Sequence, residues 1–116
     1  ICTNQTLNAV GSTIHLSWLG PEGLYEIGYQ AIQKASYMKQ ALIENGFTVL
    51  NNNTSLREFL IQTKRLAEDV ILEMGSKGFL AGIKYSDNEI LIAVTEKRTR
   101  EQIDNYVESL MEVDNA

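Results

Sequence analysis

Apolar side chains recur at spacings of three and four residues through the first 45 positions, a period typical of amphipathic helices. Two such runs are present: Leu7, Val10, Ile14 and Trp18, then Leu24, Ile27, Ala31, Ala35, Met38 and Leu42. The segment Leu19-Gly20-Pro21-Glu22-Gly23 separates them, because glycine interrupts a helix and proline is favoured at the first position of the next. The pattern therefore predicts two helices in residues 1–45. We expect Thr3 or Asn4 to cap the first helix and Asn45-Gly46 to end the second.

Beyond Gly46 the sequence changes to short β-prone runs that alternate with helical patterns. Strands are predicted at 47–50, 58–62, 79–85 and 89–94, with a tight turn at 86–88 joining the last two. A third helix is expected from about residue 66, with its end at Gly75 or Gly78. The capping box Thr99-Arg100-Glu101-Gln102 predicts the start of a last helix. Its expected buried stripe is Ile103, Tyr106, Val107, Leu110 and Met111.

This order of elements, α-α-β-β-α-β-β-α, defines the expected fold class. A small antiparallel or mixed sheet with helices packed on one face satisfies it, which is an α+β fold. The 116 residues, 44% of them hydrophobic, suit one core and hence one domain. We expect residues 1–45 to supply two helices and residues 46–116 a ββαββα sandwich.

Charge and apolar patterning exclude several classes of protein. The net charge of −5 argues against a nucleic-acid or anionic-membrane surface, because both need clustered lysine and arginine. The longest apolar run, Ile90 to Val94, is far shorter than the ~20 residues of a membrane-spanning helix. Cys2 is the only cysteine, so no intrachain disulfide can form, and this fits a reducing compartment. A cytoplasmic location is expected.

The residues that usually carry chemistry are sparse. One histidine and one cysteine cannot build a zinc site, and no calcium-binding loop is present, so no metal is expected. The segment 75–78 has glycines and a lysine but lacks the spacing of a phosphate-binding loop. No lysine has the apolar pocket and phosphate donors of a Schiff-base site. We expect all six to face solvent: Lys34, Lys39, Lys64, Lys77, Lys84 and Lys97. We predict no catalytic and no cofactor-binding residue in this chain.

Three motifs occur in the order found in one known family. They are Ile1-Cys2-Thr3-Asn4-Gln5 with Leu7-Asn8-Ala9, then Leu19-Gly20-Pro21-Glu22-Gly23-Leu24, then Val94-Thr95-Glu96-x-Arg98-Thr99. The chain resembles the C-terminal region of glycine dehydrogenase (decarboxylating) subunit 1, the alpha subunit of the glycine cleavage system P-protein. The resemblance covers essentially the whole chain and implies a fragment of a longer subunit, as does a start at Ile1 without a polar lead-in.

The resemblance carries expectations about fold and activity. It implies the small C-terminal domain of aspartate-aminotransferase-like (fold type I) enzymes that use pyridoxal phosphate. The parent complex would decarboxylate glycine and transfer the aminomethyl group to the lipoyl arm of the H-protein. Subunit 2 of the P-protein would hold the pyridoxal phosphate. This chain would be inactive alone, with a structural or interface role in an oligomer, and would self-associate when isolated.

Seven residues are candidates for the cleft or for an interface with the partner: Cys2, Thr3, Asn4, Gln5, Thr95, Glu96 and Arg98. Many small domains of this superfamily carry an arginine on a strand to bind the substrate carboxylate, but the corresponding stretch here, 89–92, has none. Arg98 lies just beyond it, either as a substitute or as an interface contact. The alternative to the function implied by the resemblance is a small amino-acid-binding regulatory module, since such domains also combine short strands with helices on one face.

Overall fold

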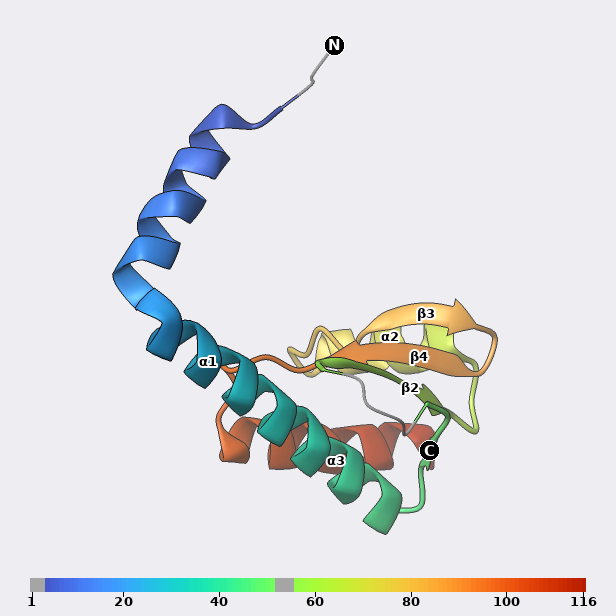
Figure 1. Cartoon of the computed structure of the whole chain (residues 1–116). Coiled ribbons are helices and arrows are strands. Elements are labelled where there is room, and N and C mark those ends of the chain that lie inside the picture. The colour runs from blue at the N-terminus through green and yellow to red at the C-terminus, as the bar shows by residue number, and fades with distance from the viewer. Residues whose placement is uncertain (1–3, 52–55) are drawn as a thin grey trace.

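The computed structural model describes residues 4–51 and 56–116, which form three helices and four strands (Figure 1). In chain order the elements are α1 (Thr6–Glu44), β1 (Thr48–Val49), β2 (Glu58–Gln62), α2 (Ala67–Ser76), β3 (Ile83–Ser86), β4 (Glu89–Ala93) and α3 (Arg100–Asp114). The order agrees with that predicted from the sequence, with the two N-terminal helical runs joined into the single bent helix α1.

The bend in α1 lies within the segment predicted to interrupt it. Gly20 has φ 63° and ψ −176°, a conformation open only to glycine, and Pro21 starts the next helical turn. The N-terminal half of α1, beyond this bend, projects away from the sheet (Figure 1). The predicted cap at Asn4 is wrong, because Gln5 occupies the N-cap position and makes no side-chain capping bond; Thr3 lies outside the described residues. At the other end Asn45 caps the helix and Gly46 has φ 89°, as expected.

The sheet is wholly antiparallel, in the order β1-β2-β4-β3. Phe59 faces Ile92 and Ile61 faces Ile90 across the central pair, and all four side chains are buried. The alternate positions, including Leu60 and Leu91, lie on the opposite face. This alternation of buried and exposed side chains is typical of a sheet that is buried on one face and open on the other.

Helices cover one face of the sheet, which confirms the predicted α+β class. The C-terminal half of α1 lies beside α3 (Figure 1), and α2 contacts α3 and β3. One continuous core results, in which Leu42 of α1, Phe59 of β2, Met74 of α2 and Leu110 of α3 are fully buried.

The strand expected over 79–85 begins only at Ile83. Phe79 turns toward α3, where its ring meets Tyr106 edge to face at 5.7 Å. The Tyr106 hydroxyl donates a hydrogen bond to the Ala81 carbonyl at 2.5 Å. Gly82 then follows with φ 146°. Contacts with α3 thus keep residues 79–82 out of the sheet. Strand propensity gave no indication of these contacts.

Candidate functional site

The candidate residues lie in two separate places. Asn4 and Gln5 stand at the tip of the projecting half of α1, whereas Thr95, Glu96 and Arg98 lie in the loop between β4 and α3 (Figure 1). Cys2 and Thr3 lie outside the described residues. Asn4 accepts a hydrogen bond from the Thr6 hydroxyl at 3.4 Å, and both side chains are exposed. Within this chain the two groups do not form one site.

The loop between β4 and α3 is held by its own backbone and by α1. The Thr95 carbonyl accepts from the Arg98 N–H at 3.2 Å, and the Thr95 hydroxyl accepts from the Lys97 N–H at 3.4 Å. The Glu96 carbonyl accepts from Lys34 Nζ of α1. Thr95 and Glu96 therefore act here through loop geometry, and their contacts fix the start of α3.

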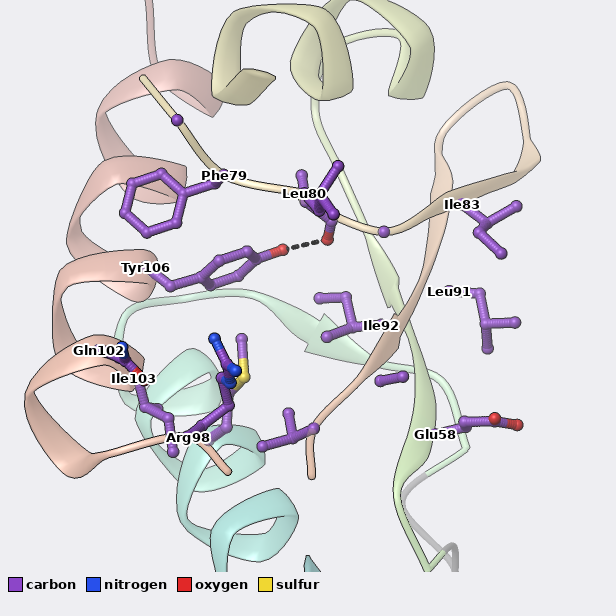
Figure 2. A pocket seen from close by; sticks show the side chains of 16 residues that line it. Glu58, Phe79, Leu80, Ile83, Leu91, Ile92, Arg98, Gln102, Ile103 and Tyr106 are labelled. Atoms are coloured by element: carbon purple, nitrogen blue, oxygen red, sulfur yellow. Dashed lines mark hydrogen bonds between the residues drawn. The ribbon is translucent and has the colours of Figure 1, made fainter. Parts of the chain in front are cut away.

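Next to this loop lies a cavity of about 500 Å³. It is bounded by the segment 78–82, by β4 and by the first turns of α3, and most of its walls are apolar. Figure 2 shows the Arg98 side chain pointing into it, beneath the ring of Tyr106. Sequence analysis named Arg98 but did not predict the cavity, since the cavity exists only because residues 79–82 leave the sheet.

The polar groups of the cavity are few. Gln102 lines it, but its side-chain oxygen accepts from the Thr99 N–H at 3.1 Å as part of the capping box. Burial raises the pKa of Tyr106, so its hydroxyl stays protonated and serves as a donor to Ala81. Glu58 is the one acidic side chain among the described residues of the lining, and Figure 2 shows it on the far side of β4, pointing away from Arg98. Among the described residues, Arg98 makes no hydrogen bond or ion pair with another side chain, so the cavity favours an anionic group.

The cavity does not fit pyridoxal phosphate. That cofactor needs a lysine for the Schiff base and side-chain or backbone donors for its phosphate. The described lining contains no lysine, serine or threonine, and its one acidic side chain points away from the interior. No acid and base are paired across it either, so we derive no chemical step here.

Two lysines depart from the sequence prediction: Lys34 is half-buried, with its Nζ bonded to the Glu96 carbonyl, and Lys39 is buried. Lys39 was expected to face solvent, yet it is 7% exposed, and its Nζ lies 5.9 Å from the centre of the Phe59 ring. Its position one turn beyond Ala35 on the helix could have indicated this, because residues four apart share a face. Lys39 does not line the cavity, so it does not alter the conclusion about the cofactor.

A second feature is the bare apolar stripe on the projecting half of α1. We define it as Leu7, Val10, Ile14 and Trp18, the apolar face of the first predicted helix. Leu7 is 84% exposed and Trp18 82% exposed, and none of the four is buried. Stacked Tyr25 and Tyr29, with ring centres 5.9 Å apart, extend the exposed surface along α1. Monomeric proteins rarely leave such a stripe in water, so it is a candidate interface.

Within residues 4–51 and 56–116, no group of three acidic, histidine or cysteine side chains could hold a metal ion. In the same residues, none of the helices has the length of apolar sequence that spanning a bilayer requires.

Comparison with known proteins gives a consistent result. The family model for the glycine cleavage system P-protein matches residues 1–110. The chain is 37% identical over 122 residues to the probable glycine dehydrogenase (decarboxylating) subunit 1 of Staphylococcus haemolyticus, a match over 100% of this chain and 27% of the relative. Its identity to the protein of the same name from Staphylococcus aureus (strain JH9) is 41% over 121 residues, covering 99% of this chain and 27% of the relative.

A solved structure is also similar. The crystal structure of glycine decarboxylase (P-protein) of the glycine cleavage system, in inhibitor-bound form, superimposes with a TM-score of 0.88 at 29% identity. The match covers 97% of this chain and 27% of that chain. The present chain thus spans about a quarter of the length of the relatives it matches.

Proposed function

This chain belongs to the glycine cleavage system P-protein family, and on that premise we propose that it is the small C-terminal domain of a glycine dehydrogenase (decarboxylating) subunit 1. Its length, about a quarter of such a subunit, supports this assignment. So does the exposed apolar stripe on α1, which is the observation that carries the proposal. A domain within a larger subunit would bury that stripe against the remainder.

The role of the domain in this proposal is structural. Each side chain of the stripe contributes about 1.5–3 kcal/mol when fully buried. Four of them therefore suffice to fix α1 against another surface. The described lining of the cavity beside α3 has no lysine and no acid–base pair, and we assign the domain no catalytic group. Asn4 and Gln5 stand at the end of the stripe, and we assign them, with Cys2 and Thr3, to the same contact.

The parent complex is proposed to decarboxylate glycine and to pass the aminomethyl group to the lipoyl arm of the H-protein. In this proposal subunit 2 of the P-protein holds the pyridoxal phosphate, and the two subunits form an oligomer in the cytoplasm. Thr95, Glu96 and Arg98 then shape the side of the domain next to the cavity. Arg98 serves in a contact within the assembly rather than in binding glycine.

The proposal is tested by measuring the mass of the natural protein and identifying the proteins bound to it. An antibody raised against this chain would be used to capture its antigen from a native cell extract, with an unrelated antibody as control. We expect a polypeptide several times heavier than 13.0 kDa, together with a second subunit that carries pyridoxal phosphate. A free chain of about that mass without such a companion would overturn the proposal. The 116-residue chain mixed with pyridoxal phosphate is expected to release no carbon dioxide from glycine.

The cavity supports a second candidate, the amino-acid-binding regulatory module. A guanidinium directed into an apolar cavity could bind a carboxylate, although Glu58 points away and leaves no acidic partner for an amino group. If this candidate is correct, glycine or another amino acid raises the melting temperature of the chain. The increase would be lost in Arg98→Gln and kept in Lys97→Gln, a matched change of one exposed cation. No shift with any amino acid would exclude it.

A further inference from the structure

The edge of β4 beside the cavity is left without a partner. The Val94 N–H donates to the Arg57 carbonyl at 2.9 Å and the Thr63 N–H donates to the Asn88 carbonyl at 2.9 Å, so the even-numbered residues of β4 bond β2. In an antiparallel sheet the odd-numbered residues then direct their N–H and C=O groups toward the other neighbour. Pairing with β3 ends at Leu91, opposite Ile83. Among the described residues, nothing bonds the N–H and C=O of Ala93 on this side.

The described residues 79–82 do not pair with this edge. The Ala81 carbonyl accepts from the Tyr106 hydroxyl, and Phe79 packs against the same ring, so both are directed toward α3. Gly82 lies so close to β4 that a Cβ there would sit 2.5 Å from the Leu91 carbonyl oxygen, and its φ of 146° turns the chain at this point. Contacts with α3 therefore keep the gap beside Ala93 open.

The gap has the shape that a strand requires. Its lining includes Ile92 and Val94, which face the core, and also Leu91 and Ala93, which lie on the open face of the sheet. The cavity thus extends on both sides of the sheet plane beside β4. Alternate side chains of an extended segment would enter these two sides in turn. At its end, below Tyr106, stands the guanidinium of Arg98 (Figure 2).

We propose that an extended segment from the remainder of the longer subunit fills this gap, bonds to the N–H and C=O of Ala93 as a short added strand, and pairs an acidic side chain with Arg98. The inference rests on the proposed function, since it needs a longer polypeptide. The relatives offer one, because about three quarters of their length lies outside the match.

The short length of the free edge indicates that the segment belongs to the same polypeptide rather than to a separate peptide. Ala93 offers one donor and one acceptor, and two hydrogen bonds give too little net free energy to hold a separate peptide. A segment of the same polypeptide is present at an effective concentration of about a millimolar or more, so a short edge is enough. Arg98 favours an acidic segment, because a carboxylate would form an ion pair with its guanidinium, which has none within the described chain.

Amide hydrogen exchange tests the added strand. The exchange rate of the Ala93 N–H would be measured in the 116-residue chain and in the natural full-length subunit, with the paired Leu91 N–H as an internal control. We expect Ala93 to exchange at least about a hundredfold more slowly in the full-length subunit, while Leu91 is protected in both. Equal rates for Ala93 in the two proteins would overturn the inference. So would protection that appears only when subunit 2 is added, because the occupant would then be a different chain.

A charge-matched pair of variants tests the role of Arg98. In the full-length subunit, Arg98→Gln should speed exchange at Ala93 at least about tenfold, and Lys97→Gln should leave it unchanged. The same effect from both variants, or from neither, would contradict the acidic contact. Failure of the proposed function looks different: the natural polypeptide would then have the mass of the 116-residue chain, and there would be no longer subunit to compare.

Discussion

Gly82 is the residue whose conformation most directly sets the start of β3. Its φ of 146° and the 2.5 Å approach of a Cβ to the Leu91 carbonyl oxygen both exclude a side chain. We expect Gly82→Ala to lower the free energy of unfolding by about 1–3 kcal/mol, as measured by urea denaturation. Gly75→Ala is the control, because Gly75 is helical with open space around its Cβ position. This change should be neutral or stabilise by about 0.5–1 kcal/mol, and a similar loss in both variants would contradict the explanation.

The ion pair between Arg65 and Glu73 makes stability depend on pH. The guanidinium makes two bonds to the carboxylate, of 2.9 and 2.6 Å, and these hydrogen bonds hold the pKa of Glu73 below its usual value. A depressed folded pKa contributes stability that is present above the unfolded value of about 4.3 and is lost as the pH falls through the folded pKa. The pair is partly exposed, so the effect is small.

The measurement is urea denaturation from pH 7 down to pH 3. Glu73→Gln should be less stable than the wild type at pH 7, and the difference should shrink as the pH falls below about 4.3. Arg65→Gln should lose the same pH-dependent part, with no further pH-dependent loss in the double variant. A difference that stays constant over the whole range would show that the pair does not cause it.

The sequence predicted contacts between residues close together in the chain, but it did not predict contacts between residues far apart in it. Thr99 and Gln102 form the predicted capping box, because a cap involves only residues three apart. Asp114 was missed. It is buried and accepts hydrogen bonds from the backbone N–H groups of Lys64 and Arg65, about fifty residues away in sequence. No periodicity within a helix indicates such a partner.

At the scale of elements, the two halves of α1 have opposite roles in stability. Leu42 in the C-terminal half is fully buried, whereas Leu7 in the N-terminal half is 84% exposed. We expect Leu42→Ala to cost about 2–5 kcal/mol of unfolding free energy, because it leaves a cavity between α1 and the sheet. Leu7→Ala should change stability by less than about 0.5 kcal/mol at protein concentrations where this chain is monomeric. Comparable losses in chemical denaturation would mean that the N-terminal half packs elsewhere.

The sequence predicted the ends of helices and strands correctly where interactions between neighbouring residues determine them. β2 begins and ends at the predicted residues, and the turn at Asp87-Asn88 joins β3 to β4 as expected. β1 is shorter than predicted, with pairing to β2 only at Thr48 and Val49. The late start of β3 follows from Tyr106, which lies in another element. Tertiary contacts thus decided the boundaries that propensity misplaced.

For the molecule as a whole, the candidate site was only partly predictable. The family resemblance pointed to Arg98, and the spacing of three and four residues pointed to the apolar face of the first helix. It did not reveal the cavity, since this depends on the bend of residues 79–82 against α3. Asn4 and Gln5 are distant from Arg98 because the first half of α1 extends beyond the sheet and α3 (Figure 1).

The bare stripe leads to a prediction for the isolated chain. A helix of the length of 6–19 is marginal in water without a partner surface, and its exposed apolar face favours association with a second copy. We expect sedimentation equilibrium to give a molecular mass that rises with concentration. Val10→Glu with Ile14→Glu should restore the monomer, because two charges would have to be desolvated in the contact.

Leu72→Glu on α2 is the matched control, since Leu72 is also exposed but lies outside the stripe. This variant should associate as the wild type does. In the full-length subunit the remainder of the polypeptide would cover the stripe, and Trp18 fluorescence should shift to shorter wavelength than in the double variant. A wild-type chain that stays monomeric at all concentrations, with the emission of a fully hydrated Trp18, would show that the stripe is tolerated in water. The stripe would then cease to support an interface on α1.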